Sequence, residues 1–222
     1  MKSTFLLICC SSLSMFLAAC VAGPAMIRFN PSDVTLKPGT VSSWNFDAEK
    51  SGSLPKGSSV FSGKWAVRAE PGSPSGPNAL CQTGNADFPS MTLSDEVYAN
   101  FTLETRFKAV SGQQDRAAGL IFRSQDAKNH LIVRANALEN NLRIYVFSGG
   151  QRGQPFADGS VPLETGKWHA LKLEVIGSSF KAFVDGKLVT QGSDGTFKAG
   201  RIGLWTKADS VTCFDDVTVT AQ

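Results

Sequence analysis

Three arginines stand at similar places in three successive segments that are predicted to be β-strands. They are Arg123 in residues 118–124, Arg134 in residues 130–137 and Arg143 in residues 141–147. Side chains alternate between the two faces of a strand, so each arginine lies opposite a set of apolar side chains in its own segment. If the segments are neighbours in one antiparallel sheet, the arginines line a single polar surface. A guanidinium fork holds carboxylates or vicinal hydroxyl groups in a fixed geometry, so this surface is the candidate binding site.

Other residues are predicted to share this surface. Tyr145 lies on the same face as Arg143, and Asn136 and Glu139 stand at the turn between the second and third segments. Turn formation is the alternative role for the last two, because such residues are common in turns for backbone reasons. The alternative for the arginines is a solvated face on which they pair with nearby acids. These acids are Asp115, Asp126 and Glu139.

A second group of side chains lies where a predicted closing strand, residues 201–206, ends. Trp205 alternates with Leu204 and therefore points away from that core position. An exposed indole beside Lys207 and Asp209 would offer a ring face and hydrogen-bonding groups, which is what stacking on a sugar needs. The alternative is a partly buried tryptophan that caps the core.

The elements that position these residues are predicted to be strands throughout. Further strands are expected at residues 43–47, 64–70, 79–83, 98–110, 169–175, 180–184, 187–191 and 211–220. Asp185-Gly186 between two alternating segments is a strong hairpin signal. Residues 86–93 are expected to form an edge strand because of Pro89, and residues 151–159 a loop. Strands of this length between frequent turn signals predict an all-β sandwich or barrel.

Composition is typical of a globular protein. The 222 residues are 42% hydrophobic and 18% charged, with a net charge of +3. This charge, without an aromatic stacking motif, argues against nucleic acid as a partner.

The N-terminus reads as a targeting segment. Lys2 precedes an apolar run over residues 5–17 that is too short to be a stable membrane span. It ends in Leu-Ala-Ala-Cys, which resembles a bacterial lipobox with Cys20 as the lipidated residue. We therefore expect a lipoprotein-type signal peptide at 1–19, a lipidated cysteine and tether at 20–42, and a folded domain at 43–222. An ordinary secretory leader cleaved near Ala22 is the alternative.

This prediction places the mature chain in the bacterial cell envelope, anchored by lipid to a membrane. Val21 follows the cysteine instead of the aspartate typical of inner-membrane retention, which favours the outer membrane or a periplasm-facing location. After removal of the leader and lipidation of Cys20, the pair Cys81 and Cys213 remains. A disulfide between them fits an oxidising compartment, and two buried free thiols are the alternative. No cysteine or histidine spacing suggests a zinc site.

Several segments together resemble a known family. They are AAGLIFR (117–123), RANALENNLRIY (134–145), KWHALKLEV (167–175), FVDGKL (183–188) and GLWTKADSVTCFDDV (203–217). These are similar to bacterial domains of the 3-keto-disaccharide hydrolase type, over roughly residues 43–222. The resemblance implies a concanavalin-A-like, laminin-G-like jelly roll, a β-sandwich of two curved antiparallel sheets. For the named members it implies cleavage of 3-keto-glycosides by lyase or hydrolase chemistry. The ExDxxE-type strand of related jelly-roll glucanases does not occur here, which disfavours that direct retaining hydrolysis.

Chemistry of this kind needs a base beside the ketone, and His130 is the candidate because it is predicted on the arginine face. A role as an exposed strand residue is the alternative. Asp215 and Asp216 match the family's FDD ending and could bind a divalent metal such as calcium. Because neighbouring side chains on a strand point apart, a bulge with one aspartate bonded to backbone is the preferred interpretation.

Two functions therefore stay open from the sequence. The first is an extracytoplasmic protein that binds a carbohydrate or glycoside and cleaves 3-keto-glycosides. The second is a non-catalytic, lectin-like or structural module of the cell envelope.

Overall fold

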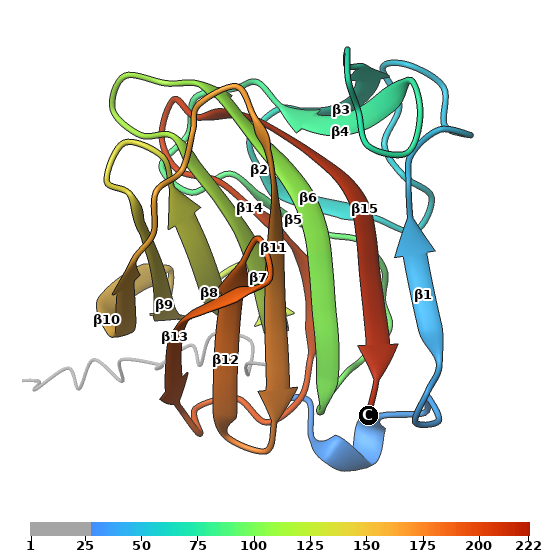
Figure 1. The fold of residues 1–222 in the computed structure, drawn as a ribbon. Coiled ribbons are helices and arrows are strands. Elements are labelled where there is room, and N and C mark those ends of the chain that lie inside the picture. The colour runs from blue at the N-terminus through green and yellow to red at the C-terminus, as the bar shows by residue number, and fades with distance from the viewer. Residues whose placement is uncertain (1–27) are drawn as a thin grey trace, which may run out of the picture.

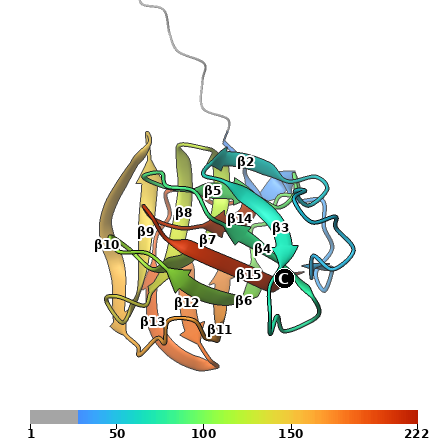
Figure 2. The same cartoon turned by 90° about the horizontal axis from the view of Figure 1, so that it is seen from above.

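The computed structural model describes residues 28–222, which form a β-sandwich of two antiparallel sheets in a jelly-roll arrangement. Figure 1 shows the long strands of one sheet in front of the other, and Figure 2 shows both sheets from above. Sheet A runs in the order β13 (Lys187–Ser193), β12 (Ser179–Val184), β11 (Trp168–Ile176), β6 (Phe101–Ser111), β15 (Val211–Ala221), β4 (Asn78–Gln82) and β3 (Trp65–Ala69), with β1 (Val41–Trp44) also paired to β15. Sheet B runs in the order β10 (Gln151–Ser160), β9 (Asn141–Ser148), β8 (Asn129–Asn136), β7 (Ala117–Asp126), β14 (Arg201–Trp205), β5 (Ser90–Thr92) and β2 (Ser59–Ser62).

The core lies between the two sheets and follows the period-2 alternation of the strands. Its buried side chains include Leu103, Phe107, Leu173 and Phe214 from sheet A and Leu120, Val133, Ile144 and Leu204 from sheet B. Sheet B carries a second, smaller apolar cluster on its opposite face, which we call its outer face. This outer cluster consists of Ala117, Ile121, Ile132, Phe147 and Trp205, with Phe61 and Phe88 packed against it.

The predicted hairpin at Asp185-Gly186 is confirmed. The two residues join β12 to β13 with φ values of 48° and 78°. Positive φ at both central positions is the requirement of the hairpin turn whose twist matches that of the flanking strands. Asp185 also accepts hydrogen bonds from the Ala170 amide and from the His169 ring on β11, both at 2.8 Å.

Two predicted elements differ in the structure. Residues 151–159, expected to be a loop, belong to edge strand β10, whose pairing with β9 shifts on both sides of Pro155. Such bulges accommodate a proline at a sheet edge. Residues 86–93, expected to form an edge strand, instead contain β5, which pairs with both β14 and β2. Pro89 lies just outside the paired residues, so its missing N–H removes no bond from the ladder.

The predicted signal peptide at 1–19 and Cys20 lie outside the described residues. Part of the expected tether, residues 28–40, contacts the sandwich. The Phe29 amide donates to Gln125 Oε1 at 2.6 Å and the Gly39 amide to the Ala221 carbonyl at 2.8 Å. A short 3-10 helix, Pro31–Asp33, lies between these contacts. None of the helical residues in the described part of the chain forms a helix long and apolar enough to cross a membrane.

Candidate functional site

The predicted neighbourhood of the three central segments is confirmed. β7, β8 and β9 lie side by side in sheet B, and Arg134 stands directly opposite Arg143 in the β8–β9 ladder. Two like charges in that position repel each other. Glu139 lies between them and accepts from Arg134 Nη2 at 2.9 Å and from Arg143 Nη1 at 3.1 Å. Asp158 on β10 pairs with Arg143 from the other side at 3.0 Å.

The charge of Glu139 is strongly stabilised in this bridge. Its partial burial raises the pKa of the carboxyl, but hydrogen bonds from Arg134 and Asn141 and the charges of Arg134 and Arg143 outweigh this and hold the pKa at about 2. Asn141 donates to Glu139 at 2.9 Å and accepts from Arg134 at 2.6 Å. The Arg134–Glu139–Arg143 bridge is therefore a pre-organised, mutually paired frame on the outer face, in which only Arg134 Nε among the Arg134 nitrogens has no partner in residues 28–222.

Arg123 is not part of this surface, so the predicted row of three arginines is wrong. A bulge between Phe122 and Asp126 interrupts the β7–β8 pairing, and Arg123 has a φ of 50°. The guanidinium group is buried and donates to the carbonyls of Phe197 and Ala99, both at 2.9 Å, and of Gly177. Burial lowers the pKa of Arg123 to about 10. This arginine ties loop carbonyls together at the end of the sandwich, and a role in ligand binding there remains a prediction.

Asn136 links the bridge to a carboxyl that the sequence did not single out as a site residue. Its amide nitrogen donates to Asp115 Oδ1 at 2.5 Å, while its oxygen accepts from the Leu138 amide at 2.8 Å. Asp115 is 8% exposed. Burial raises the pKa of Asp115, and the charges of Arg134, Lys207 and Arg152 only partly oppose this.

Asp209, predicted to bind ligand, holds the segment before Asp115 in place. Its carboxylate accepts hydrogen bonds from the backbone amides of Gln113 at 2.6 Å, Gln114 at 3.0 Å and Asp115 at 3.1 Å. The Gln113 bond is the main cause of a lowered pKa for Asp209. With three donors on its two oxygens, this side chain acts as a clamp on the loop, and a direct contact with ligand remains a prediction.

Cations and aromatic rings cover the area next to Asp115. The Arg152 guanidinium lies 4.6 Å from the Tyr145 ring and 6.0 Å from the Phe88 ring, and Lys207 Nζ lies 5.1 Å from the Phe88 ring. In residues 28–222 neither Arg152 nor Lys207 pairs with a carboxylate within 4.0 Å. We call the group formed by Asp115, Arg152, Lys207, Tyr145 and Phe88 the Asp115 site.

Trp205 points away from the sandwich core as predicted, but its ring is not exposed. Phe88 stacks over it with 6.2 Å between centroids and 26° between planes, and the residue is fully buried. Beneath it Gly119 lets the indole approach the sheet, because a Cβ there would lie 3.2 Å from the ring and 2.7 Å from the Val133 carbonyl. Phe88, which sequence reasoning missed, is therefore the half-buried ring that covers Trp205 on this surface.

His130 lies on the outer face as predicted but is buried. It stacks on Phe147 with 4.6 Å between centroids and 10° between planes, and it is 1% exposed. Burial lowers the pKa of His130 to about 4, so the ring is neutral at pH 7. A catalytic role remains a prediction, although this position offers a substrate no direct access to the ring.

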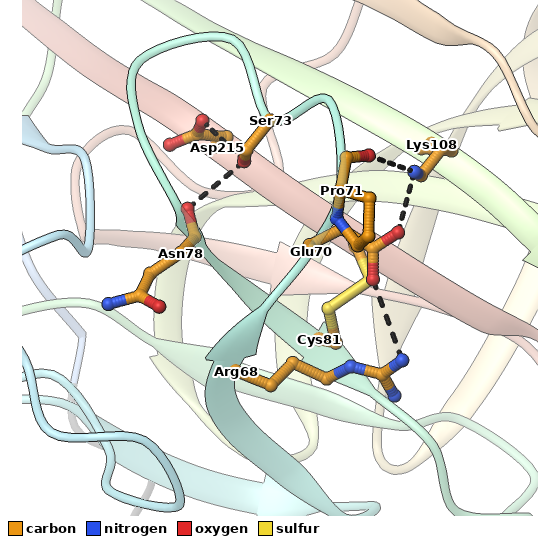
Figure 3. Close-up of a disulfide and its surroundings, with 9 residues drawn as sticks. Arg68, Glu70, Pro71, Ser73, Asn78, Cys81, Lys108 and Asp215 are labelled. Carbon is orange, nitrogen blue, oxygen red and sulfur yellow. Dashed lines mark hydrogen bonds and ion pairs between the residues drawn. A yellow bond between two sulfur atoms is a disulfide. The ribbon is translucent and has the colours of Figure 1, made fainter.

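The predicted disulfide between Cys81 and Cys213 is confirmed (Figure 3). The two residues are direct partners in the pairing of β4 with β15, and both are buried. Glu70 lies beside the bridge and pairs with Lys108 at 2.6 Å. Glu70 and the two cysteines are the one close group of metal-ligating residue types found in residues 28–222, but sulfurs joined to each other offer no thiolate to a metal.

The predicted bulge at Asp215 and Asp216 is also confirmed. Asp216 has a φ of 48°, and the pairing of β15 with β6 shifts after Asp215. Asp215 is buried and accepts from the Ser73 hydroxyl at 2.9 Å, the Ser75 amide at 3.2 Å and the Asp216 amide at 2.8 Å. These donors occupy the oxygens that a calcium ion would need.

Comparison with known proteins places this architecture. Over 138 residues, 61% of the chain, it is 31% identical to a levanase of Bacillus subtilis (strain 168), a match that spans 20% of that protein. The solved carbohydrate-binding module CBM66 from Bacillus subtilis shares 26% identity with a TM-score of 0.63, covering 74% of this chain and 96% of the module. A protein of unknown function with a galectin-like fold from the same organism shares the fold alone, at 13% identity with a TM-score of 0.59, covering 83% and 97%. Residues 39–220 match the 3-keto-alpha-glucoside-1,2-lyase-like domain, and the chain belongs to this family.

Proposed function

We propose that the domain binds carbohydrate on the outer face of sheet B, at the Asp115 site. The observation that carries this proposal is the set of polar groups there that the protein leaves without ionic partners. Within residues 28–222, Asp115 receives one side-chain hydrogen bond, from Asn136, and has no cation within 4.0 Å. Arg152 and Lys207 lie near enough for their charges to lower its pKa. A ligand that both donates and accepts hydrogen bonds would satisfy all three.

A sugar hydroxyl is such a group. It donates to the Asp115 carboxylate and accepts from the Arg152 and Lys207 cations, and charge-assisted bonds of this kind are the strong ones. The half-buried Phe88 ring supplies an apolar surface on which a carbohydrate C–H face packs, while the buried Tyr145 ring supports the Arg152 guanidinium from below. Support also comes from CBM66, by name a carbohydrate-binding module, and from the relative named as a levanase.

The test is a titration calorimetry panel on the purified full chain, with levan-derived oligosaccharides, glucose oligosaccharides and 3-keto-α-glucosides as ligands. Asp115→Asn keeps the shape and removes the charge, so we expect about 10- to 100-fold weaker binding of the preferred sugar. Glu174→Gln is the matched control, because Glu174 pairs with Lys172 on sheet A. Equal affinity of Asp115→Asn and the unaltered chain would refute the site.

The second candidate function is cleavage of a 3-keto-glycoside, and the observation that favours it is again Asp115. A buried carboxyl with a raised pKa is suited to proton transfer near neutral pH. Product formation from 3-keto-glycosides, followed by mass spectrometry, tests this function. Loss of turnover in Asp115→Asn with retained binding would assign the proton transfer to it, whereas loss in a His130 variant would assign it to the predicted base.

We also propose that the protein is extracytoplasmic and held by lipid at the cell envelope. The sequence of residues 1–20 and the Cys81–Cys213 disulfide both support this, because disulfides persist in oxidising compartments. Radiolabelled palmitate should enter the unaltered chain in a bacterial host but not Cys20→Ala. Equal labelling of both chains would contradict the anchor.

A further inference from the structure

A pocket of about 300 Å³ opens on the outer face of sheet B, beside the Asp115 site. Its walls combine aromatic rings with small polar side chains. They include Phe61, Phe88, Phe147, Ser62, Asp87 and Ser90. The volume is at the lower end of the range for ligand pockets, so the pocket suits one ring-sized unit.

The pocket and the Asp115 site share Phe88 as a common wall. Lys207 Nζ and the Arg152 guanidinium lie 5.1 Å and 6.0 Å from the Phe88 ring, and that ring also lines the pocket. Tyr145 and Phe147 stand two positions apart on β9, which is roughly 7 Å along the strand. A ligand bound to the Arg152 guanidinium, which covers the buried Tyr145 ring, therefore needs only one further unit to reach the pocket.

The floor of the pocket is firmly supported. Phe147 is 4% exposed, stacks on His130 and meets the edge of Phe88 at 5.1 Å between centroids. Phe61 and Phe88 are half-buried, so part of each ring remains accessible. This gives the buried His130 a supporting role beneath the aromatic floor.

The lining fits a second sugar better than a purely apolar group. A sugar ring has an apolar C–H face and a rim of hydroxyl groups, and the pocket offers aromatic walls together with the half-buried Ser62 hydroxyl and the exposed Asp87 carboxylate. We propose that this pocket is a second sugar subsite, so that the ligand of the domain is an oligosaccharide spanning both places. The inference rests on the proposed function, because it takes the Asp115 site as the first subsite.

The experiment compares the mono-, di- and trisaccharide of the sugar series that the full chain prefers, each titrated by calorimetry. We expect the disaccharide to bind about tenfold more tightly than the monosaccharide, with little gain from a third unit. Phe61→Ala removes one wall, and Ala127→Phe fills the pocket from the exposed end of the β7–β8 hairpin. Both should bring the ratio of the two affinities close to one. Val60→Ala, a neighbouring exposed position on β2, is the control and should keep the ratio.

The outcomes separate the two proposals. Monosaccharide binding that depends on Asp115 but shows no gain with chain length would overturn the second subsite and leave the proposed function standing. A gain with length that survives Ala127→Phe would place the second unit elsewhere and also overturn it. Absence of binding to any saccharide would overturn both. Thermal unfolding of each variant shows whether a loss of binding comes from misfolding. If Phe61→Ala misfolds, the ratio of disaccharide to monosaccharide affinity in Ala127→Phe decides between the outcomes.

Discussion

Removal of the Cys81–Cys213 disulfide should lower the free energy of unfolding by about 3 to 5 kcal/mol. The bridge joins residues 132 apart in sequence. Loop-closure entropy for about 132 residues is roughly 17 cal/mol/K, which at 25 °C makes the cross-link worth about 5 kcal/mol in the unfolded chain. The folded state should hardly change, because β4 and β15 remain paired through Thr212 with Gln82 and Phe214 with Leu80.

The assay is urea and thermal unfolding of the unaltered chain and of Cys81→Ala/Cys213→Ala, followed by circular dichroism. For a domain of this size the expected loss corresponds to a melting temperature lower by about 6 to 20 °C. Reductant is the matched control, since it should destabilise the unaltered chain and leave the double variant unchanged. Because both cysteines are buried, reduction of the native protein should be slow and follow unfolding. A double variant within about 1 kcal/mol of the oxidised chain would refute the reasoning.

Three further predictions concern sheet B. His130 has a pKa of about 4 in the folded chain, so its ring binds a proton in the unfolded chain at a higher pH than in the folded chain. The free energy of unfolding should therefore fall by about 3 kcal/mol as the pH drops from about 6.5 to about 4. Urea unfolding of His130→Phe should give a flatter dependence of this free energy on pH, and an unchanged dependence would contradict the burial of His130. The pKa of Glu139 is about 2, so its contribution to folding stability is fully present above pH about 4.5 and is lost as the pH falls through about 2. Because the side chain is 42% exposed, Glu139→Gln should lower the free energy of unfolding by only about 1 kcal/mol at pH 7. Equal free energies of unfolding for the variant and the unaltered chain would argue against the bridge. Gly119→Ala should cost about 1 to 3 kcal/mol, because its Cβ would meet the Val133 carbonyl and the Trp205 ring; a melting temperature equal to that of the unaltered chain would show that the sheet can shift there.

The strands of the sandwich could be predicted because their signals are local. Alternation within β7, β8 and β9 marks three neighbouring strands, and Asp185-Gly186 marks the hairpin between β12 and β13. The disulfide could be predicted from the number of cysteines and the compartment. The expectation of a loop at residues 151–159 is wrong because only the pairing with β9 reveals the bulged edge strand around Pro155.

The errors in the site have a different cause, which is the dependence of side-chain direction on the partner strand. One extra residue in a strand reverses every face assignment after it, and the bulge at Arg123 has this effect. Nothing local to residues 118–124 shows that bulge. Trp205 has the predicted direction, but its burial is not local either, because its cover, Phe88, comes from a segment more than a hundred positions earlier.

The features that are most visible in the sequence therefore became the frame of the site, not its contacts. Arg134, Glu139 and Arg143 pair with one another, and a charge that is already paired gains little from a ligand. The groups with unmet bonding capacity are Asp115 and the cations beside it, which come from three separate segments of the chain and share no motif. A rigid, self-paired frame that supports a few unpaired groups is the arrangement that binding needs, because the cost of ordering those groups has already been met during folding.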